Sequence, residues 1–138
     1  MNSALRANSA LRALVVEDLD FWRDTLHEIL IDAGCQVWTT SSYAEAMDAL
    51  AQNEFDLAMI DVVLDDTNPH NRDGLRVLKY ILDRQLDTRV IIVTSSDPKR
   101  IRREVAEISS GILVLWKDRW DDERFLAIVH GFFANKET

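Results

Sequence analysis

Five short apolar runs follow one another along the chain, each separated from the next by a segment with helical periodicity. Each run has the length of a strand, and together they cover residues 11–17, 36–40, 55–61, 89–95 and 112–117. Strands that are buried on both faces are nearly continuous apolar runs, and helices between them supply the cover. The alternation therefore predicts an α/β fold of the (βα)5 type, with a doubly wound, five-stranded parallel sheet.

The segments between the runs carry signals that mark helix ends. Gly34 follows the first helical stripe and suits a left-handed position after a helix. Ser42 can cap the second helix, and Glu45, three residues later, can reach back toward it. Asp97 is a cap, and Pro98 after it loses no needed hydrogen bond in the first helical turn. These signals place helix boundaries between the predicted strands.

The length and composition suit one domain with a sizeable core. The chain has 138 residues, of which 47% are hydrophobic and 29% are charged. The hexapeptide NSALRA occurs at residues 2–7 and again at residues 8–13, which is too short for a structural repeat. We expect a mobile N-terminal tail at residues 1–9 and a single domain at residues 10–138.

Composition also argues against several classes of function. No apolar run approaches the roughly 20 residues of a membrane-spanning helix, and the N-terminus lacks the apolar core of a signal peptide, so the cytoplasm is the expected location. A net charge of -8 disfavours direct binding to nucleic acid. The single cysteine, Cys35, lies in an apparent strand and is interpreted as a small core residue rather than a nucleophile.

Polar side chains stand where the predicted strands end. They are Glu17 and Asp18 after the first run, Asp61 after the third, Thr94 after the fourth and Lys117 after the fifth. Ligands of doubly wound sheets bind at the carboxyl ends of the strands, so these side chains could converge on one crevice. Taken singly, each has an ordinary alternative as a helix cap, a β-forming residue or a solvated charge. The set of five, in this order, indicates a functional site.

The chemistry of this set points to a metal ion and a phosphoryl group. Three carboxylates in one cleft repel one another unless a cation lies among them, and all-oxygen ligands favour Mg²⁺. The Lys117 amine and the Thr94 hydroxyl can each contact a phosphoryl oxygen. Asp61 is then the nucleophile, because an aspartyl phosphate is a known type of covalent intermediate.

Over about residues 11–133 the sequence resembles the receiver domain of bacterial two-component response regulators, in the stand-alone form of the chemotaxis regulator. The matching stretches are LVVED, LAMID, the pair Asp73 and Gly74, VIIVTS, and Lys117 at the end of the last run. The resemblance implies the flavodoxin-like strand order 2-1-3-4-5. It also implies that Asp61 is the phosphoacceptor.

The same resemblance assigns the other site residues. Mg²⁺ would be held by Glu17, Asp18, Asp61 and the backbone carbonyl of Val63. Thr94 would be the switch hydroxyl and Lys117 the lysine that contacts the phosphoryl group, with Ser95 placed beside them.

Two departures from the family pattern concern the last strand. Asp118 follows Lys117 where the family commonly has proline, so we expect a trans peptide bond and a differently shaped last loop. Val114 occupies the position of the usual switch aromatic, and strand alternation puts Trp116 on the same face of the sheet as Val114. The usual coupling between the threonine and an aromatic ring is therefore not expected here.

A third departure is the loop at residues 62–72, which is longer than the family's usual loop. Its Asp65, Asp66 and His70 match no established spacing of metal ligands. We interpret the segment as an elongated solvated loop, or as one that gates the aspartyl pocket, rather than as a second metal site.

The function predicted from these residues is that of a phosphoryl-accepting signalling receiver. A sensor histidine kinase or a histidine phosphotransfer protein would be the donor, and the domain would catalyse only its own phosphorylation and dephosphorylation. We expect no output domain, so the domain would signal by binding another protein. It would act as a monomer or as a phosphorylation-dependent homodimer. The expected output surface comprises Lys99, Arg100, Arg102, Arg103, Val114 and Trp116.

Two alternatives stay open at this point. The first is a binding module with the same fold that acts without phosphorylation. The second is a magnesium-dependent aspartyl phosphohydrolase, which is disfavoured because such enzymes with the haloacid-dehalogenase pattern need a second aspartate where Val63 stands.

Overall fold

A computed structural model describes residues 10–137, and its core is a five-stranded parallel sheet. The strands are β1 (Arg12–Val16), β2 (Gln36–Thr40), β3 (Leu57–Ile60), β4 (Arg89–Thr94) and β5 (Leu113–Trp116). Their order in the sheet is β2-β1-β3-β4-β5, which confirms the predicted topology. The predicted tail at residues 1–9 lies outside the described residues.

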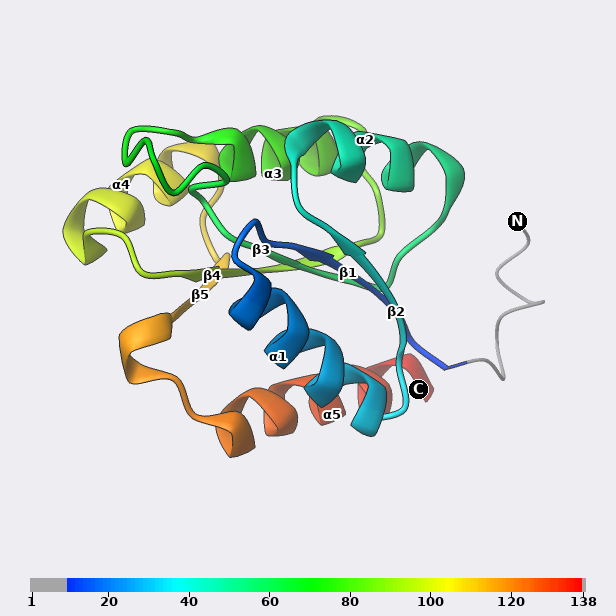
Figure 1. Cartoon of the computed structure of the whole chain (residues 1–138). Helices are drawn as coiled ribbons and strands as arrows, with labels where there is room; N and C mark the ends of the chain where they lie inside the picture. Colours follow the sequence, from blue (N-terminus) through cyan, green and yellow to red (C-terminus); the bar gives the residue numbers. More distant parts are fainter. Residues whose placement is uncertain (1–9, 138) are drawn as a thin grey trace.

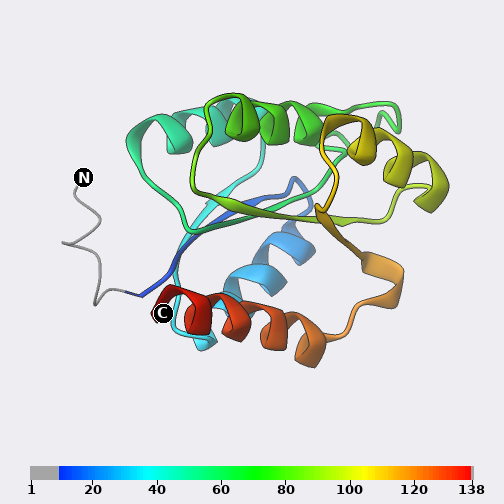
Figure 2. The ribbon, with the colours of Figure 1, turned by 180° about the vertical axis from the view of Figure 1, so that it is seen from behind.

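Five α-helices within residues 10–137 cover the two faces of this sheet. They are α1 (Asp20–Asp32), α2 (Tyr43–Gln52), α3 (Asp73–Asp83), α4 (Pro98–Ile108) and α5 (Asp122–Glu137). Helices α2, α3 and α4 lie on one face, and α1 and α5 lie on the other (Figures 1 and 2). No helix among residues 10–137 has both the length and the apolar character needed to cross a bilayer.

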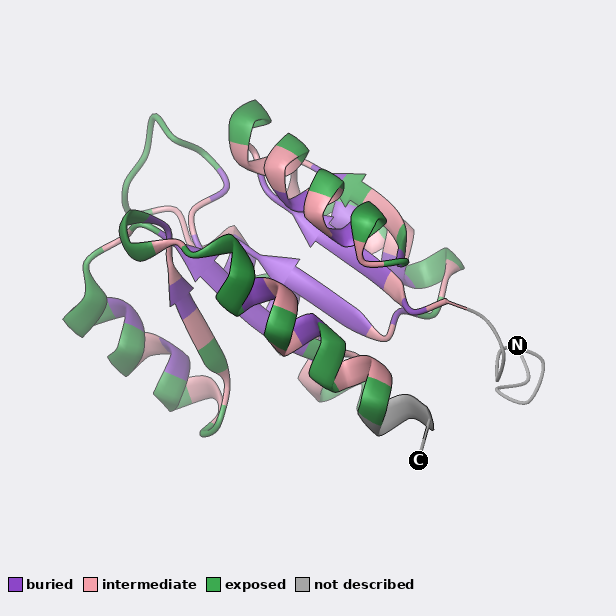
Figure 3. Cartoon of the chain, turned by 90° about the horizontal axis from the view of Figure 1, so that it is seen from below, coloured by how far each residue is buried: buried purple, intermediate pink, exposed green. Residues whose placement is uncertain are grey.

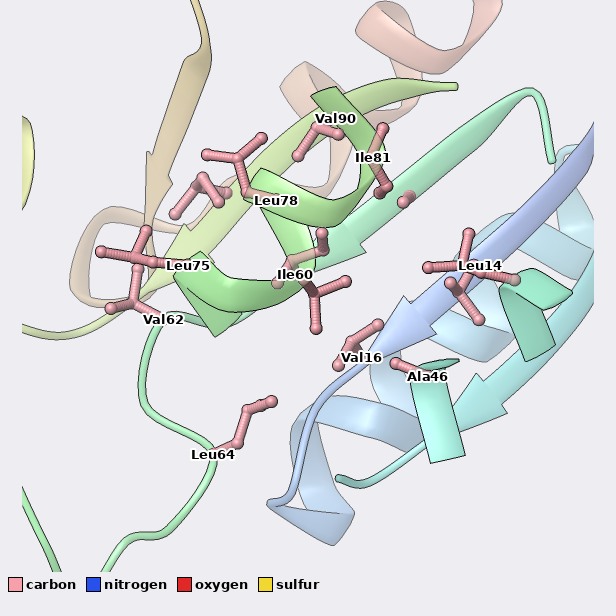
Figure 4. Close-up of a cluster of buried hydrophobic side chains, with 14 of the residues drawn as sticks. Leu14, Val16, Ala46, Ile60, Val62, Leu64, Leu75, Leu78, Ile81 and Val90 are labelled. Carbon is pink, nitrogen blue, oxygen red and sulfur yellow. The ribbon is translucent and has the colours of Figure 1, made fainter. Parts of the chain in front are cut away.

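The core is divided by the sheet into two layers because successive strand residues point to opposite faces. Leu14, Val16 and Ile60 pack toward α2 and α3, together with Leu78 and Ile81 (Figure 4). The alternate strand residues pack against Leu26 and Leu30 of α1 and Phe125 and Val129 of α5. The inner strands β1, β3 and β4 are accordingly buried almost throughout, whereas the edge strands β2 and β5 are partly exposed and each helix exposes its outer side (Figure 3).

The helix-end signals work as the sequence predicts, with one change. The Ser42 hydroxyl accepts a hydrogen bond from the Glu45 amide at 3.1 Å, and Asp97 accepts one from the Lys99 amide at 3.0 Å. Gly34 adopts a left-handed φ of +94°. The Glu45 carboxylate, however, accepts from the amide of Ser41 at 2.8 Å rather than from the cap residue itself.

The end of β5 also agrees with expectation. No peptide bond among residues 10–137 is cis, so the bond after Lys117 is trans, and the chain turns there through a short 3-10 helix, η2 (Lys117–Arg119). Val114 and Trp116 both pack against the core layer under α2 to α4, which confirms that they share a face.

Cys35 lies in the core layer under α1 and α5 with 5% of its surface exposed. Burial, with a smaller contribution from the charge of Asp56, raises the pKa of the Cys35 thiol from about 9.0 to about 11. The position fits a structural core residue.

This environment predicts that Cys35 is chemically inert in the folded protein. Because a rise of the pKa from 9.0 to about 11 leaves roughly one hundredth of the thiolate, alkylation at pH 8 should be at least about 100-fold slower than in unfolding concentrations of urea. Iodoacetamide labelling followed by intact mass measures both rates. Equal rates in the two conditions would contradict this placement of the thiol.

Candidate functional site

The carboxyl ends of β1 and β3 bring the acidic residues together. The two strands are paired with Val16 opposite Ile60, so the residues that follow them lie side by side. The Asp61 amide donates to the Val16 carbonyl at 3.0 Å, and the Glu17 amide donates to the Thr40 carbonyl at 3.0 Å. These bonds extend the sheet by one residue and fix the backbone that carries both carboxylates.

Lys117 joins the two carboxylates from the end of β5. Its Nζ lies 2.6 Å from Glu17 Oε1 and 2.8 Å from Asp61 Oδ2, and all three side chains are buried. The ring of Trp22, from α1, lies 5.2 Å from the same amine and adds a cation–π contact. The amine therefore points into the acidic cluster, as the sequence reasoning requires.

Asp18 completes a three-carboxylate cluster with Glu17 and Asp61. One carboxylate oxygen of each lies within 4.8 Å of the others, a spacing at which a single cation could contact all three. Burial, followed by the charge of Asp61, raises the pKa of Glu17 to about 8, although Lys117 opposes the shift. Burial also raises the pKa of Asp18. Additional positive charge in the cluster would favour the ionised forms, so the donor set fits a hard divalent cation.

Thr94 is fully buried at the end of β4, but its hydroxyl is directed to a different partner. It donates to the Ser96 Oγ at 3.4 Å, and within residues 10–137 it makes no hydrogen bond to Asp61 or Lys117. Its neighbour Ser95 is exposed and lines the cavity that contains Asp61. Four of the five predicted side chains thus form one contact cluster. Thr94 is hydrogen-bonded to Ser96 and not to this cluster.

The cavity above the carboxylates has a volume of about 390 Å³. Asp18, Asp61 and Val63 line it, and the Val63 amide donates to Asp61 Oδ1 at 3.3 Å. Asp61 therefore has one oxygen toward Lys117 and one toward the backbone of the following loop. The predicted role of the Val63 carbonyl as a metal ligand remains a prediction.

The loop at residues 62–72 makes specific contacts with the rest of the domain, although its residues 65–70 are exposed. Leu64 is buried against the core layer of α3 (Figure 4), and the Asn71 Oδ1 accepts from its amide at 3.0 Å. The exposed part of the loop reaches back to the acidic cluster, where the Asp66 amide donates to Asp18 Oδ2 at 3.2 Å. Sequence reasoning missed this contact, because every residue except proline carries a backbone donor and nothing in the sequence marks this one.

The end of the same loop is attached to α4. Arg72 donates through Nε to Glu104 Oε1 at 2.8 Å and through a terminal nitrogen to Oε2 at 3.3 Å. It also donates to the carbonyls of Pro69 and Asn71 at 2.9 and 2.8 Å. A two-bond arginine–carboxylate pair has a defined geometry, so it ties the loop to the helix.

Gly74 permits close contact between the start of α3 and the backbone of Asp61. A Cβ atom at this position would lie 1.8 Å from the Asp61 carbonyl oxygen, far inside van der Waals contact. The Gly74 amide also donates to the Val62 carbonyl at 3.0 Å. A glycine is therefore needed where α3 passes the nucleophile's backbone.

A doubly wound five-stranded sheet, with a lysine held between buried carboxylates at its carboxyl edge, is the arrangement expected of a receiver domain. The model of the response regulator receiver domain family matches residues 13–118. The chain therefore belongs to the response regulator receiver domain family, whose members serve signalling in two-component systems.

Solved receiver structures share this fold. A CheY-like receiver domain from Methanospirillum hungatei is 19% identical, with a TM-score of 0.78 over 94% of this chain and 98% of that chain. A receiver protein from Burkholderia phymatum is 20% identical, with a TM-score of 0.72 over 90% and 95%. A CheY-like receiver domain from Methylobacillus flagellatus is 24% identical, with a TM-score of 0.71 over 90% and 99%. No curated protein matches the chain's sequence.

Proposed function

We propose that this receiver accepts a phosphoryl group on Asp61, with Mg²⁺ bound, and signals through contacts with another protein. The donor would be a sensor histidine kinase or a histidine phosphotransfer protein. The observation that carries the proposal is the position of Lys117 Nζ, 2.8 Å from Asp61 Oδ2, beside a cluster of three carboxylates. A buried amine in contact with the nucleophile can stabilise the negative charge that develops on a phosphoryl group during its transfer.

Each residue has a distinct part in this proposal. Glu17, Asp18, Asp61 and the Val63 carbonyl would hold Mg²⁺, which when bound would neutralise phosphoryl oxygens. A carboxylate oxygen of Asp61 attacks the phosphorus, and Lys117 then contacts the transferred group. The Thr94 hydroxyl would leave Ser96 and donate to a phosphoryl oxygen, with Ser95 beside it at the cavity wall.

The output surface would lie over α4 and β5. Thr94 is paired in register with Trp116, so a movement of Thr94 reaches β5 directly and does not require an aromatic ring at Val114. Arg102 lies over the Trp116 ring at 5.5 Å, and both line a cavity of about 200 Å³. Lys99, Arg100 and Arg103 are exposed on α4. This surface would suit an acidic partner; the monomeric or dimeric state remains a prediction.

Phosphorylation by a small donor tests the proposal. We expect the wild-type protein to gain one phosphoryl group by intact mass when it is incubated with acetyl phosphate and Mg²⁺, and Asp61→Asn to gain none. Asp65→Asn changes an exposed carboxylate that accepts hydrogen bonds from Thr67 and lies outside the three-carboxylate cluster, so this variant should gain the group like wild type. Chelation of Mg²⁺ by EDTA should prevent the gain. Equal labelling of Asp61→Asn would assign the phosphoryl group to another residue.

The static binding module is the competing function. The Glu17–Lys117–Asp61 contacts alone could serve as a permanent buried ion cluster, and Val114 lacks the switch ring. A wild-type protein that gains no phosphoryl group from the donor and still binds a partner would support this alternative. Repeated turnover of a generic phosphoester would instead support the phosphohydrolase.

A further inference from the structure

The cavity over Asp61 has carboxylates at its floor and charged side chains of both signs around them. Asp18 and Asp61 line it, and the surrounding groups are Asp66, His70, Arg72, Asp97 and Arg100. The carboxylates of Asp18 and Asp61 suit a cation, as described above, whereas the basic side chains around them can attract the negative charge of a donor that must approach Asp61. These basic side chains come from the loop at residues 62–72 and from α4, and not from the strands that carry the carboxylates.

Only one of these basic side chains is both permanently charged and uncommitted. Arg72 is bound to Glu104 and to two carbonyls, and His70 does not carry a permanent charge. The guanidinium of Arg100 makes no hydrogen bond, ion pair or ring contact with any part of the chain that the structure describes, and Arg100 is exposed. Its side chain is therefore available to a ligand that enters the cavity.

The placement of Arg100 does not serve the stability of α4. It lies in the first helical turn, where the helix dipole favours acidic side chains and disfavours cations. The cap Asp97 uses its carboxylate to accept from the amides of Lys99 and Arg100, at 3.0 and 3.5 Å. Arg100 lies beside the cavity that contains the nucleophile. Attraction of an anionic ligand therefore explains its charge better than stabilisation of the helix does.

We propose that Arg100 is a positioning residue that recruits anionic acyl phosphates to Asp61, an inference that rests on the proposed function. In the reaction, an Asp61 oxygen forms a bond to phosphorus while the bond from phosphorus to the acyl oxygen breaks. The electron pair of the broken bond leaves with the carboxylate product, and no proton is required. Arg100 can donate two parallel hydrogen bonds to the donor's oxygens, which holds the dianion at the cavity mouth.

Rates of phosphorylation by acetyl phosphate, at saturating Mg²⁺, test this role. At a donor concentration below KM we expect Arg100→Ala to be phosphorylated about fivefold to tenfold more slowly than wild type. The substitution should raise KM and leave the maximal rate unchanged. Arg100→Lys should recover at least half of the loss, because it restores the charge. Lys79→Ala, which removes one exposed charge from α3, should stay within about twofold of wild type. Raising the ionic strength should reduce the difference between Arg100→Ala and wild type.

The possible outcomes separate the two proposals. If wild type gains the phosphoryl group and Arg100→Ala keeps its KM, the role of Arg100 is wrong while the proposed function stands. An equal loss in Arg100→Ala and Lys79→Ala would assign the effect to the overall charge of the protein, and this too would overturn the role. If wild type gains no phosphoryl group, both proposals fall together.

Discussion

Replacing Lys117 by methionine is expected to lower the free energy of unfolding by about 3 to 5 kcal/mol and to remove most of the phosphorylation of Asp61. The substitution takes away the amine that lies 2.6 Å from Glu17 and 2.8 Å from Asp61, and leaves two buried carboxylates facing each other. Urea unfolding in the presence of EDTA measures the first effect, and intact mass after incubation with acetyl phosphate and Mg²⁺ measures the second.

A second substitution distinguishes charge from packing in this result. Adding Glu17→Gln to Lys117→Met removes one of the two carboxylates, so the double variant should be more stable than Lys117→Met alone. Lys79→Met, on the exposed side of α3, should change stability by less than about 0.5 kcal/mol. A Lys117→Met protein as stable as wild type would show that the buried carboxylates do not depend on the amine.

The sheet could be predicted from the sequence because its inner strands β1, β3 and β4 are buried on both faces. Residues 57–60 and 89–94 form β3 and β4 inside longer apolar runs, and such runs have few other stable arrangements. The convergence of Glu17, Asp61 and Lys117 followed from the same reasoning, since parallel strands end at a common edge. Long sequence separation was no obstacle here, because the topology alone brings these residues together.

The contacts of the loop at residues 62–72 could not be predicted in this way. The hydrogen bond from the Asp66 amide to Asp18 spans 48 positions and uses a backbone group. The Arg72–Glu104 pair joins residues 32 positions apart, and many other charged pairs were equally compatible with the sequence. The direction of the Thr94 hydroxyl toward Ser96 depends on a side-chain rotamer, which residue type alone does not specify.

Gly74 is another residue whose physical role could not be predicted from the sequence. Its substitution is the second change for which we expect a large effect. The sequence marks Gly74 as a match to the family, whereas the structure supplies the physical reason, a Cβ position 1.8 Å from the Asp61 carbonyl oxygen. Gly74→Ala is expected to destabilise the protein by about 3 kcal/mol, because the opposing atoms are backbone and cannot rotate away. Urea unfolding measures the change.

The same substitution should also damage the site. Relief of the clash requires a shift between α3 and the backbone that carries the nucleophile, and a misplacement of about 1 Å can cost about 100-fold in rate. The fraction of Gly74→Ala that remains folded should therefore be phosphorylated far more slowly than wild type. Gly131→Ala is the matched control, since a Cβ there meets nothing within 4 Å and alanine favours the interior of α5 by about 0.5 to 1 kcal/mol. Equal stability and equal phosphorylation of both alanine variants would mean that α3 does not pack on Asp61 as the structure places it.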